Sequence, residues 1–150
     1  MKRQNKARRL KMRLESTIAS LDKAQSLIIQ FAEQADYGEE DCRQIGLAVR
    51  ESVANAVLHG NQSDTKKKVS LNAEIRWPVL VISVTDEGKG FDVSSVPDPF
   101  EEANLLRESG RGLSLIRALM DEVKIRRTPG GTELTMSKCH SSHVMKAARR

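Results

Sequence analysis

The segment Asp86-Glu87-Gly88-Lys89-Gly90-Phe91 places a carboxylate and two glycines directly after an apolar run, residues 79 to 85. Such a run predicts a buried strand that carries Asp86 to its end. Glycine allows a backbone to come close to a planar or phosphorylated ligand. The segment alone also fits an ordinary turn. Its chemistry therefore depends on whether other parts of the chain complete a nucleotide site.

A second pair of glycines, Gly110 and Gly112, flanks Arg111 and precedes apolar residues at helical spacing. This pattern predicts a helix over residues 112 to 121, whose first turn has unpaired N–H groups and the positive end of the helix dipole. A helix start of this kind binds anions such as phosphate, and Arg111 can add a charge-assisted contact. A glycine-flanked helix entry with no ligand is the alternative interpretation.

Polar residues recur four positions apart in a third segment, predicted as a helix from residue 39 to about residue 59. Positions four apart differ by about 40° around a helix, so Glu51, Asn55 and His59 share one stripe. The stripe either faces solvent or lies over a cleft. In a cleft, the Asn55 carboxamide suits Mg²⁺, which takes few protein ligands. Glu51, one turn earlier, could orient or deprotonate an attacking hydroxyl.

Alternating and helical spacings predict the elements that position these residues. In chain order they are a strand near residues 10–14, a helix capped by Ser20 and ending near Gly38, the helix of residues 39–59, a hairpin of residues 69–75 and 79–85, the helix of residues 112–121, and a hairpin of residues 123–128 and 132–136. The fold class that follows is an α/β (α+β) two-layer sandwich. It has a mixed, mainly antiparallel sheet with three helices on one face.

Length and composition indicate one globular domain. The chain has 150 residues, of which 39% are hydrophobic and 30% charged. We expect a basic, flexible extension at residues 1–9, the domain at 10–138, and a disordered tail at 139–150. The chain has no apolar run of membrane-spanning length and no secretory signal, so a cytoplasmic location is expected. Its two cysteines, Cys42 and Cys139, are far apart, which favours free thiols.

The net charge of +5 comes mainly from the two ends of the chain. Between residues 14 and 138 the basic and acidic groups nearly balance, so we assign the excess to tails rather than to a folded basic face. Aromatic residues are not interleaved with the basic ones, as base-stacking surfaces require. We therefore do not expect direct nucleic-acid binding. Binding through the basic ends remains a weaker alternative.

The three motifs together resemble those of the GHKL (Bergerat-fold) ATPases. Residues 51–61, Glu51-Ser52-Val53-Ala54-Asn55-Ala56-Val57-Leu58-His59-Gly60-Asn61, resemble the N box, residues 86–91 the first glycine box and residues 110–116 the second. The run from Arg111 to Val123, with Gly131-Thr132 after it, is similar to the anti-sigma-factor serine/threonine kinases. The resemblance covers roughly residues 14–138 and implies the histidine-kinase-type ATPase fold.

The resemblance also implies a role for each matching residue. Glu51 matches the proposed general base, Asn55 the Mg²⁺ ligand, and Asp86 the aspartate that accepts a hydrogen bond from the adenine amino group. The other matches line the nucleotide: Gly88 and Gly90 around the base, Gly110, Arg111, Gly112 and Leu113 where the lid meets the phosphates, and Thr132 behind the adenine. Residues 92–109, which lack periodicity, would then form the ATP lid.

The function that the resemblance implies is an ATP- and Mg²⁺-dependent serine/threonine-protein kinase that acts as an anti-sigma factor. It would phosphorylate an anti-sigma-factor antagonist, sequester a sigma factor and form a homodimer. A different class stays open, namely an ATP-binding regulatory module that holds a partner without phosphate transfer. The presence of Glu51 favours the enzyme.

Overall fold

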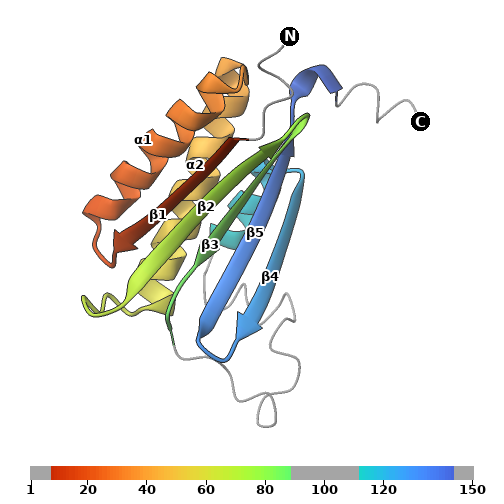
Figure 1. Cartoon of the computed structure of the whole chain (residues 1–150). Coiled ribbons are helices and arrows are strands. Elements are labelled where there is room, and N and C mark those ends of the chain that lie inside the picture. The colour runs from red at the N-terminus through yellow and green to blue at the C-terminus, as the bar shows by residue number, and fades with distance from the viewer. Residues whose placement is uncertain (1–7, 89–111, 144–150) are drawn as a thin grey trace.

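The computed structural model describes residues 8–88 and 112–143. The strands are β1 (Arg8–Glu15), β2 (Lys68–Arg76), β3 (Val79–Thr85), β4 (Glu122–Thr128) and β5 (Gly131–Cys139). The helices are α1 (Ala19–Gln34), α2 (Glu39–Asn55) and α4 (Gly112–Leu119), with a π-helical turn, η1 (Ala56–Gly60). The strands form one sheet in the order β1-β2-β3-β5-β4, and the helices cover one face of it (Figure 1).

The predicted two-layer α+β fold is confirmed, and the described part of the sheet is antiparallel throughout rather than mixed. Alternation of side chains explains the sheet. Along β2, the apolar residues point toward the helices and are buried: Val69, Leu71, Ala73 and Ile75. The register of the predicted hairpin sets Ala73 opposite Ile82, so both strands present apolar residues to the same face.

Helices α1 and α2 lie close together. A Cβ built on Gly46 of α2 would come 2.6 Å from Cδ1 of Ile29 of α1, so the absence of a side chain there permits the close approach. The prediction that Ser20 caps α1 is wrong. Ser20 lies within the helix, and its hydroxyl donates to the Glu15 carbonyl at 2.7 Å instead of capping a helical N–H group.

The predicted helix of residues 39–59 changes its geometry near its end. α2 stops at Asn55, and the last turn, η1, is π-helical, with the Asn61 N–H donating to the Ala56 carbonyl at 2.7 Å. The 100° spacing of an α-helix therefore holds for Glu51 and Asn55 but cannot be extended to His59, which is exposed. Single π-helical turns occur often at functional sites.

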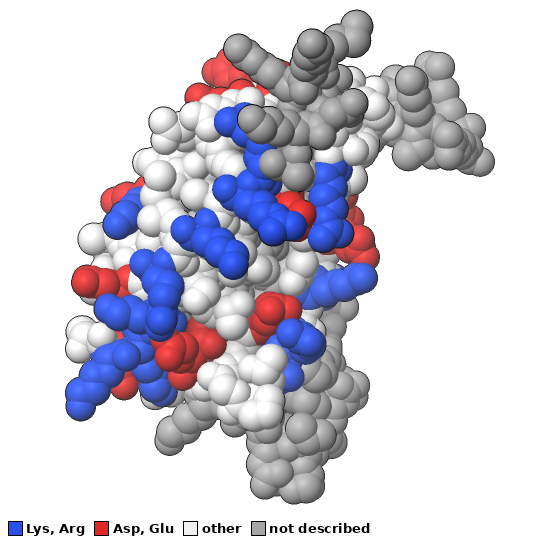
Figure 2. Space-filling view, viewed as in Figure 1, with Lys and Arg blue, Asp and Glu red and all other residues white. Residues whose placement is uncertain are grey.

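The basic residues from Arg8 to Arg13 lie on the folded sheet. β1 begins at Arg8, and its residues Arg9, Lys11 and Arg13 alternate with apolar ones, so they face away from the helices. Figure 2 shows Lys and Arg side chains gathered over this open face, with acidic side chains among them. The charge is partly compensated, since Arg9 pairs with Glu74 at 3.5 Å and Arg13 with Glu87 at 3.3 Å.

Ordered contacts at the other end continue past the expected boundary at residue 138. β5 runs to Cys139, and the His140 N–H donates to the Pro78 carbonyl at 2.7 Å. The His140 ring lies 5.0 Å from the Tyr37 ring and 4.6 Å from the Trp77 ring, between centroids. Both cysteines are free thiols, as expected, and Cys42 is buried in the core.

Candidate functional site

Asp86 follows the last residue of β3 and is only 7% exposed. Its backbone N–H donates to the Thr132 carbonyl at 3.0 Å, and its Oδ1 accepts the N–H groups of Thr132 at 3.1 Å and Gly88 at 2.9 Å. Oδ1 is therefore fully engaged. Among the described residues no hydrogen bond reaches Oδ2, so this oxygen is available to a donor on a ligand.

Burial raises the pKa of the Asp86 carboxyl, because the charged form loses hydration. The N–H groups of Gly88 and Thr132 oppose this shift by stabilising the carboxylate, and the positive charges of Arg127 and Lys67 act in the same direction as the N–H groups. A buried carboxylate with one oxygen held by the backbone is suited to recognising a neutral N–H donor, such as the amino group of a base.

Three glycines allow the chain to pack directly against Asp86. A Cβ on Gly60, at the end of η1, would lie 2.1 Å from Asp86 Oδ2, and one on Gly131 would lie 2.0 Å from the Asp86 carbonyl oxygen. A Cβ on Gly88 would lie 2.3 Å from the Gly60 carbonyl oxygen. No side chain fits at these positions, so the three glycines and Thr132 form the surroundings of one carboxylate.

Glu51 and Asn55 face the beginning of α4. A Cβ built on Gly112 would lie 3.2 Å from both side-chain polar atoms of Asn55 and 3.3 Å from Oε2 of Glu51. Both side chains are half-buried, which excludes the fully solvated helix face considered above. The structure thus brings a carboxamide, a carboxylate and the first turn of a helix together. The unpaired N–H groups of that turn favour an anion.

The helix α2 and its π-helical turn connect these two groups of residues. Asn55 ends α2 and Gly60 ends η1, so they are separated by about 8 Å or less along the axis at 1.5 Å per residue. The carboxylate of Asp86 therefore lies near one end of the region and the start of α4 near the other. An elongated ligand with a base and a phosphate chain would contact both.

The remaining predicted residues divide into two sets. Gly90, Gly110 and Arg111 lie outside the described residues, as does the expected lid at 92–109. Leu113 is 1% exposed and packs in the core, so its side chain supports α4 rather than facing a ligand. Thr132 is half-buried and contacts Asp86 through its backbone N–H and carbonyl groups.

Three residues that the sequence did not assign to a site contribute to it. Gly60 and Asn61 are the last two residues of the segment that resembles the N box, and Gly131 precedes Thr132 in the segment that resembles the anti-sigma-factor kinases. Their places in these motifs were the signal that the sequence offered. The close approach of Gly60 and Gly131 to Asp86 has no local sequence signal, because it depends on how distant segments pack.

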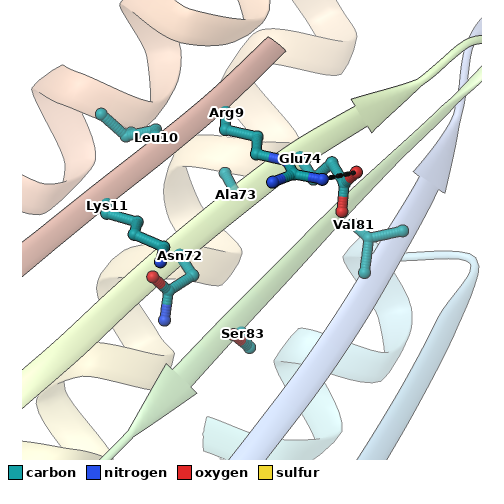
Figure 3. A pocket seen from close by; sticks show the side chains of 8 residues that line it. All are labelled: Arg9, Leu10, Lys11, Asn72, Ala73, Glu74, Val81 and Ser83. Atoms are coloured by element: carbon teal, nitrogen blue, oxygen red, sulfur yellow. Dashed lines mark hydrogen bonds and ion pairs between the residues drawn. The ribbon is translucent and has the colours of Figure 1, made fainter. Parts of the chain in front are cut away.

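A hollow of about 240 Å³ lies on the open face of the sheet, lined by side chains of β1, β2 and β3 (Figure 3). Its charged residues include Arg9, Lys11 and Glu74, and Arg9 already pairs with Glu74. None of the predicted site residues lines it. The hollow is on the side of the sheet opposite to the helices, so it is separate from the site described above.

Comparison with known protein families agrees with this geometry. Residues 14–138 match the histidine kinase-like ATPase domain, and this range contains all three motifs. The chain belongs to the histidine kinase-like ATPase domain family. The GHKL resemblance is thereby confirmed, and binding of ATP follows from the nature of the domain.

Named relatives of this ATPase domain include bacterial regulators. The anti-sigma F factor of Thermoanaerobacter sp. (strain X514) is 33% identical over 118 residues, which cover 77% of this chain and 82% of the relative. The serine-protein kinase RsbW of Oceanobacillus iheyensis is 32% identical over 113 residues, covering 71% of each chain. The chain is therefore similar in sequence to an anti-sigma factor and to a serine-protein kinase.

Solved structures support the fold. The RsbU and RsbW domains of Rv1364c from Mycobacterium tuberculosis superpose with a TM-score of 0.67 at 23% identity, covering 88% of this chain and 32% of that longer chain. The histidine kinase domain from Erythrobacter litoralis EL346 gives a TM-score of 0.58 at 22% identity, covering 87% of this chain and 64% of that one. Among the described residues, no helix is long and apolar enough to cross a membrane.

Proposed function

We propose that the chain is an ATP-dependent serine/threonine-protein kinase that acts as an anti-sigma factor. It phosphorylates an anti-sigma-factor antagonist in the cytoplasm, sequesters a sigma factor when free of that antagonist, and works as a homodimer. The names of its relatives support this class of function. The observation that carries the proposal is the close approach of the α4 start to Asn55 and Glu51, because it brings two separate motifs together.

The adenine end of ATP is held at Asp86. Oδ2 accepts a hydrogen bond from the adenine amino group, while Oδ1 remains fixed by two backbone N–H groups. Gly88 and Gly90 let the backbone close around the base, and Thr132 lies behind it. The fit depends on the ionised form of Asp86, because a carboxylate accepts hydrogen bonds at both oxygens.

The phosphates are held at the start of α4, where Gly110, Arg111, Gly112 and Leu113 belong to the proposed phosphate-binding turn. Asn55 would hold Mg²⁺ through its side-chain oxygen. The described residues contain no group of three or more His, Cys, Asp or Glu side chains that could hold a metal. Mg²⁺ takes few protein ligands and completes its shell with phosphate and water. When bound, Mg²⁺ neutralises charge on the phosphates.

Glu51 is the proposed general base. As the serine or threonine oxygen of the antagonist bonds to the γ-phosphorus, Glu51 accepts the hydroxyl proton. The bond between the γ-phosphorus and its bridging oxygen breaks, and ADP leaves. Positioning and charge neutralisation supply most of the acceleration in phosphoryl transfer, and general-base catalysis contributes about 10²- to 10⁴-fold. Loss of the base should therefore slow transfer without removing ATP binding.

The test is phosphate transfer from labelled ATP to a co-encoded antagonist. Glu51→Gln should bind ATP normally and transfer phosphate about 10²- to 10⁴-fold more slowly, whereas Asn55→Ala should lose nucleotide-dependent activity. Glu39→Gln is the matched control, since Glu39 is an exposed acidic residue in the first turn of the same helix. Normal transfer by the Glu51→Gln protein would show that the base assignment is wrong.

The same assay separates the enzyme from the binding module. Bound ATP with no label on the antagonist, in the wild-type protein, would leave only the regulatory module that holds a partner without phosphate transfer. Label on a serine or threonine of the antagonist would support the kinase.

A further inference from the structure

Asn61 is a buried amide that lies between the π-helical turn and the strand β2, with 1% of its surface exposed. Its Nδ2 donates to the Ser16 hydroxyl oxygen at 2.9 Å and to the Lys68 carbonyl at 3.0 Å. Its Oδ1 accepts the Glu87 N–H at 2.8 Å. A buried amide is costly unless it is paired, and this one is paired at both ends.

These bonds belong to a longer chain. The Ser16 hydroxyl, which accepts from Asn61, donates in turn to the Lys67 carbonyl at 2.6 Å. The amide therefore ties together the residue after β1, the beginning of β2 and the loop after β3. Connected hydrogen bonds in a buried setting strengthen one another and define a single arrangement.

The loop that Asn61 contacts is the one that carries Asp86. The three N–H groups of its described residues, 86–88, have different partners: Asp86 donates to the Thr132 carbonyl, Gly88 donates to Asp86 Oδ1, and Glu87 donates to Asn61. The first holds the loop to β5 and the second closes the loop on itself. The third holds it to the end of η1.

Asn61 also follows Gly60, whose backbone packs against Asp86 Oδ2. The hydrogen bond from the Glu87 N–H to the Asn61 side chain thus fixes the distance between the loop and η1, and η1 borders the oxygen Oδ2 of Asp86. A shift of a few tenths of an ångström at Glu87 would move that oxygen, because the Asp86 and Glu87 peptides are adjacent.

We propose that Asn61 is a positioning residue that sets the preference of Asp86 for a base with an amino group. The proposal rests on the proposed adenine recognition by Asp86 and goes beyond it, since Asn61 itself contacts no ligand. Its role is to hold Oδ2 at the place where the amino group donates. Loss of the amide weakens that hydrogen bond and leaves the phosphate contacts in place.

The experiment compares binding of ATP and inosine triphosphate, which carries a carbonyl oxygen instead of the amino group. Binding is measured by calorimetry on the wild-type protein, Asn61→Ala and Ser16→Ala. The wild type should prefer ATP. Asn61→Ala should reduce that preference by about tenfold, the order expected from one hydrogen bond, chiefly by weakening ATP binding. Ser16→Ala removes one bond to Nδ2 and keeps the Glu87 bond, so it should lose thermal stability but retain the preference.

The outcomes are distinct. If the wild type does not prefer ATP, the proposed adenine recognition fails. If the wild type prefers ATP and the folded Asn61→Ala protein keeps the full preference for ATP over inosine triphosphate, the positioning role of Asn61 is overturned. Should Asn61→Ala not fold, Asn61→Asp keeps an acceptor for the Glu87 N–H, and should keep the preference at reduced stability. Loss of the preference in folded Asn61→Asp would also overturn the proposal.

Discussion

At the scale of single residues, two adjacent glycines differ sharply in what surrounds them. A Cβ on Gly131 would lie 2.0 Å from the Asp86 carbonyl oxygen, whereas one on Gly130 would meet nothing within 4 Å. Gly131→Ala should therefore destabilise the fold by about 1–3 kcal/mol, because backbone must move, and should weaken ATP binding through Asp86. Gly130→Ala should be neutral in both respects. Urea unfolding and ATP titration of both variants test this.

Equal stability of the two glycine variants would contradict the close packing at Asp86. If Gly131→Ala lost stability but bound ATP normally, the loop would tolerate displacement without changing the base-recognising oxygen.

The raised pKa of Asp86 predicts opposite pH effects on the free and the nucleotide-bound protein. In the free fold, the contribution of Asp86 to stability is fully present below its unfolded pKa and is lost as pH rises through the raised folded pKa. ATP binding needs the carboxylate, so affinity should fall as pH drops through that folded pKa, which lies above 3.8. The thermal shift caused by ATP, measured between about pH 4 and 7, reports this.

Asp86→Asn is the control for that pH series. Protonation of the nucleotide affects both proteins equally, so only the difference between them reports on Asp86. The variant should bind ATP more weakly near neutral pH and show a smaller pH dependence. Identical pH profiles for the two proteins would show that protonation of Asp86 does not affect ATP binding.

The sequence was sufficient to single out candidate residues that lie within one segment, but not those that meet across the fold. Asp86, Glu51 and Asn55 stand in motifs with defined spacing, and their roles toward ATP stay predictions. Gly60 and Gly131 are needed because Asp86 approaches them closely. That approach depends on how β3, β5 and η1 pack, which no local pattern encodes.

At the scale of elements, α4 is held at both of its ends. Its first residue, Gly112, lies beside Asn55 and Glu51, and the carbonyl of its last residue, Leu119, accepts a hydrogen bond from Lys138 Nζ at 2.7 Å. Lys138 is 9% exposed and also donates to Gln44 of α2 at 2.7 Å. A positive charge at a helix C-terminus is favoured by the helix dipole.

Lys138→Met should therefore lower the free energy of unfolding by about 1–3 kcal/mol, because two part-buried acceptors lose their donor. It should also raise the Michaelis constant for ATP, since α4 is no longer fixed at its C-terminal end. Lys124→Met is the matched control, as Lys124 lies exposed on β4 beside Glu122. Unfolding curves and initial rates on both variants provide the measurement.

Unchanged stability in Lys138→Met would show that the lysine does not hold α4. Reduced stability with an unchanged Michaelis constant would show that the C-terminal end of the helix does not affect its proposed phosphate-binding end.

Strands were easier to predict than helix ends, for a physical reason. Alternation along Lys68–Arg76 distinguishes a buried from an exposed face at every second residue, so the hairpin and its limits followed from the sequence. The π-helical turn after Asn55 and the interior position of Ser20 depend on which carbonyl each donor reaches. Side-chain spacing does not set those choices. Ser20, for example, donates to the carbonyl of Glu15, five residues earlier.

At the scale of the whole molecule, the sheet order was not available from the sequence. The pairing of β3 with β5, which joins Asp86 to Thr132, connects strands separated by the helix α4 and by β4. Part of the basic charge at the N-terminal end belongs to the sheet. Arg9, Lys11 and Arg13 alternate with apolar residues in β1, the strand at the edge of the sheet.

The C-terminal residues close the end of the sheet opposite to the site. His140 donates its backbone N–H to Pro78 and its Nε2–H to the Asp36 carbonyl at 2.8 Å, and its ring contacts Tyr37 and Trp77. His143 adds a further contact with Trp77, 5.6 Å between ring centroids. These residues connect the turn between α1 and α2 with the hairpin of β2 and β3.

A chain ending at Cys139 should therefore be less stable than a chain ending at His143 by about 1–3 kcal/mol, from two hydrogen bonds and the ring contacts. ATP affinity should be the same in both. The seven residues of β3 separate this end from Asp86, a distance of about 23 Å at 3.3 Å per residue. Urea unfolding and ATP titration of the two chains test both statements.

Equal stability of the two chains would show that the His140 contacts contribute nothing. A change in ATP affinity would show that the two ends of the sheet are coupled.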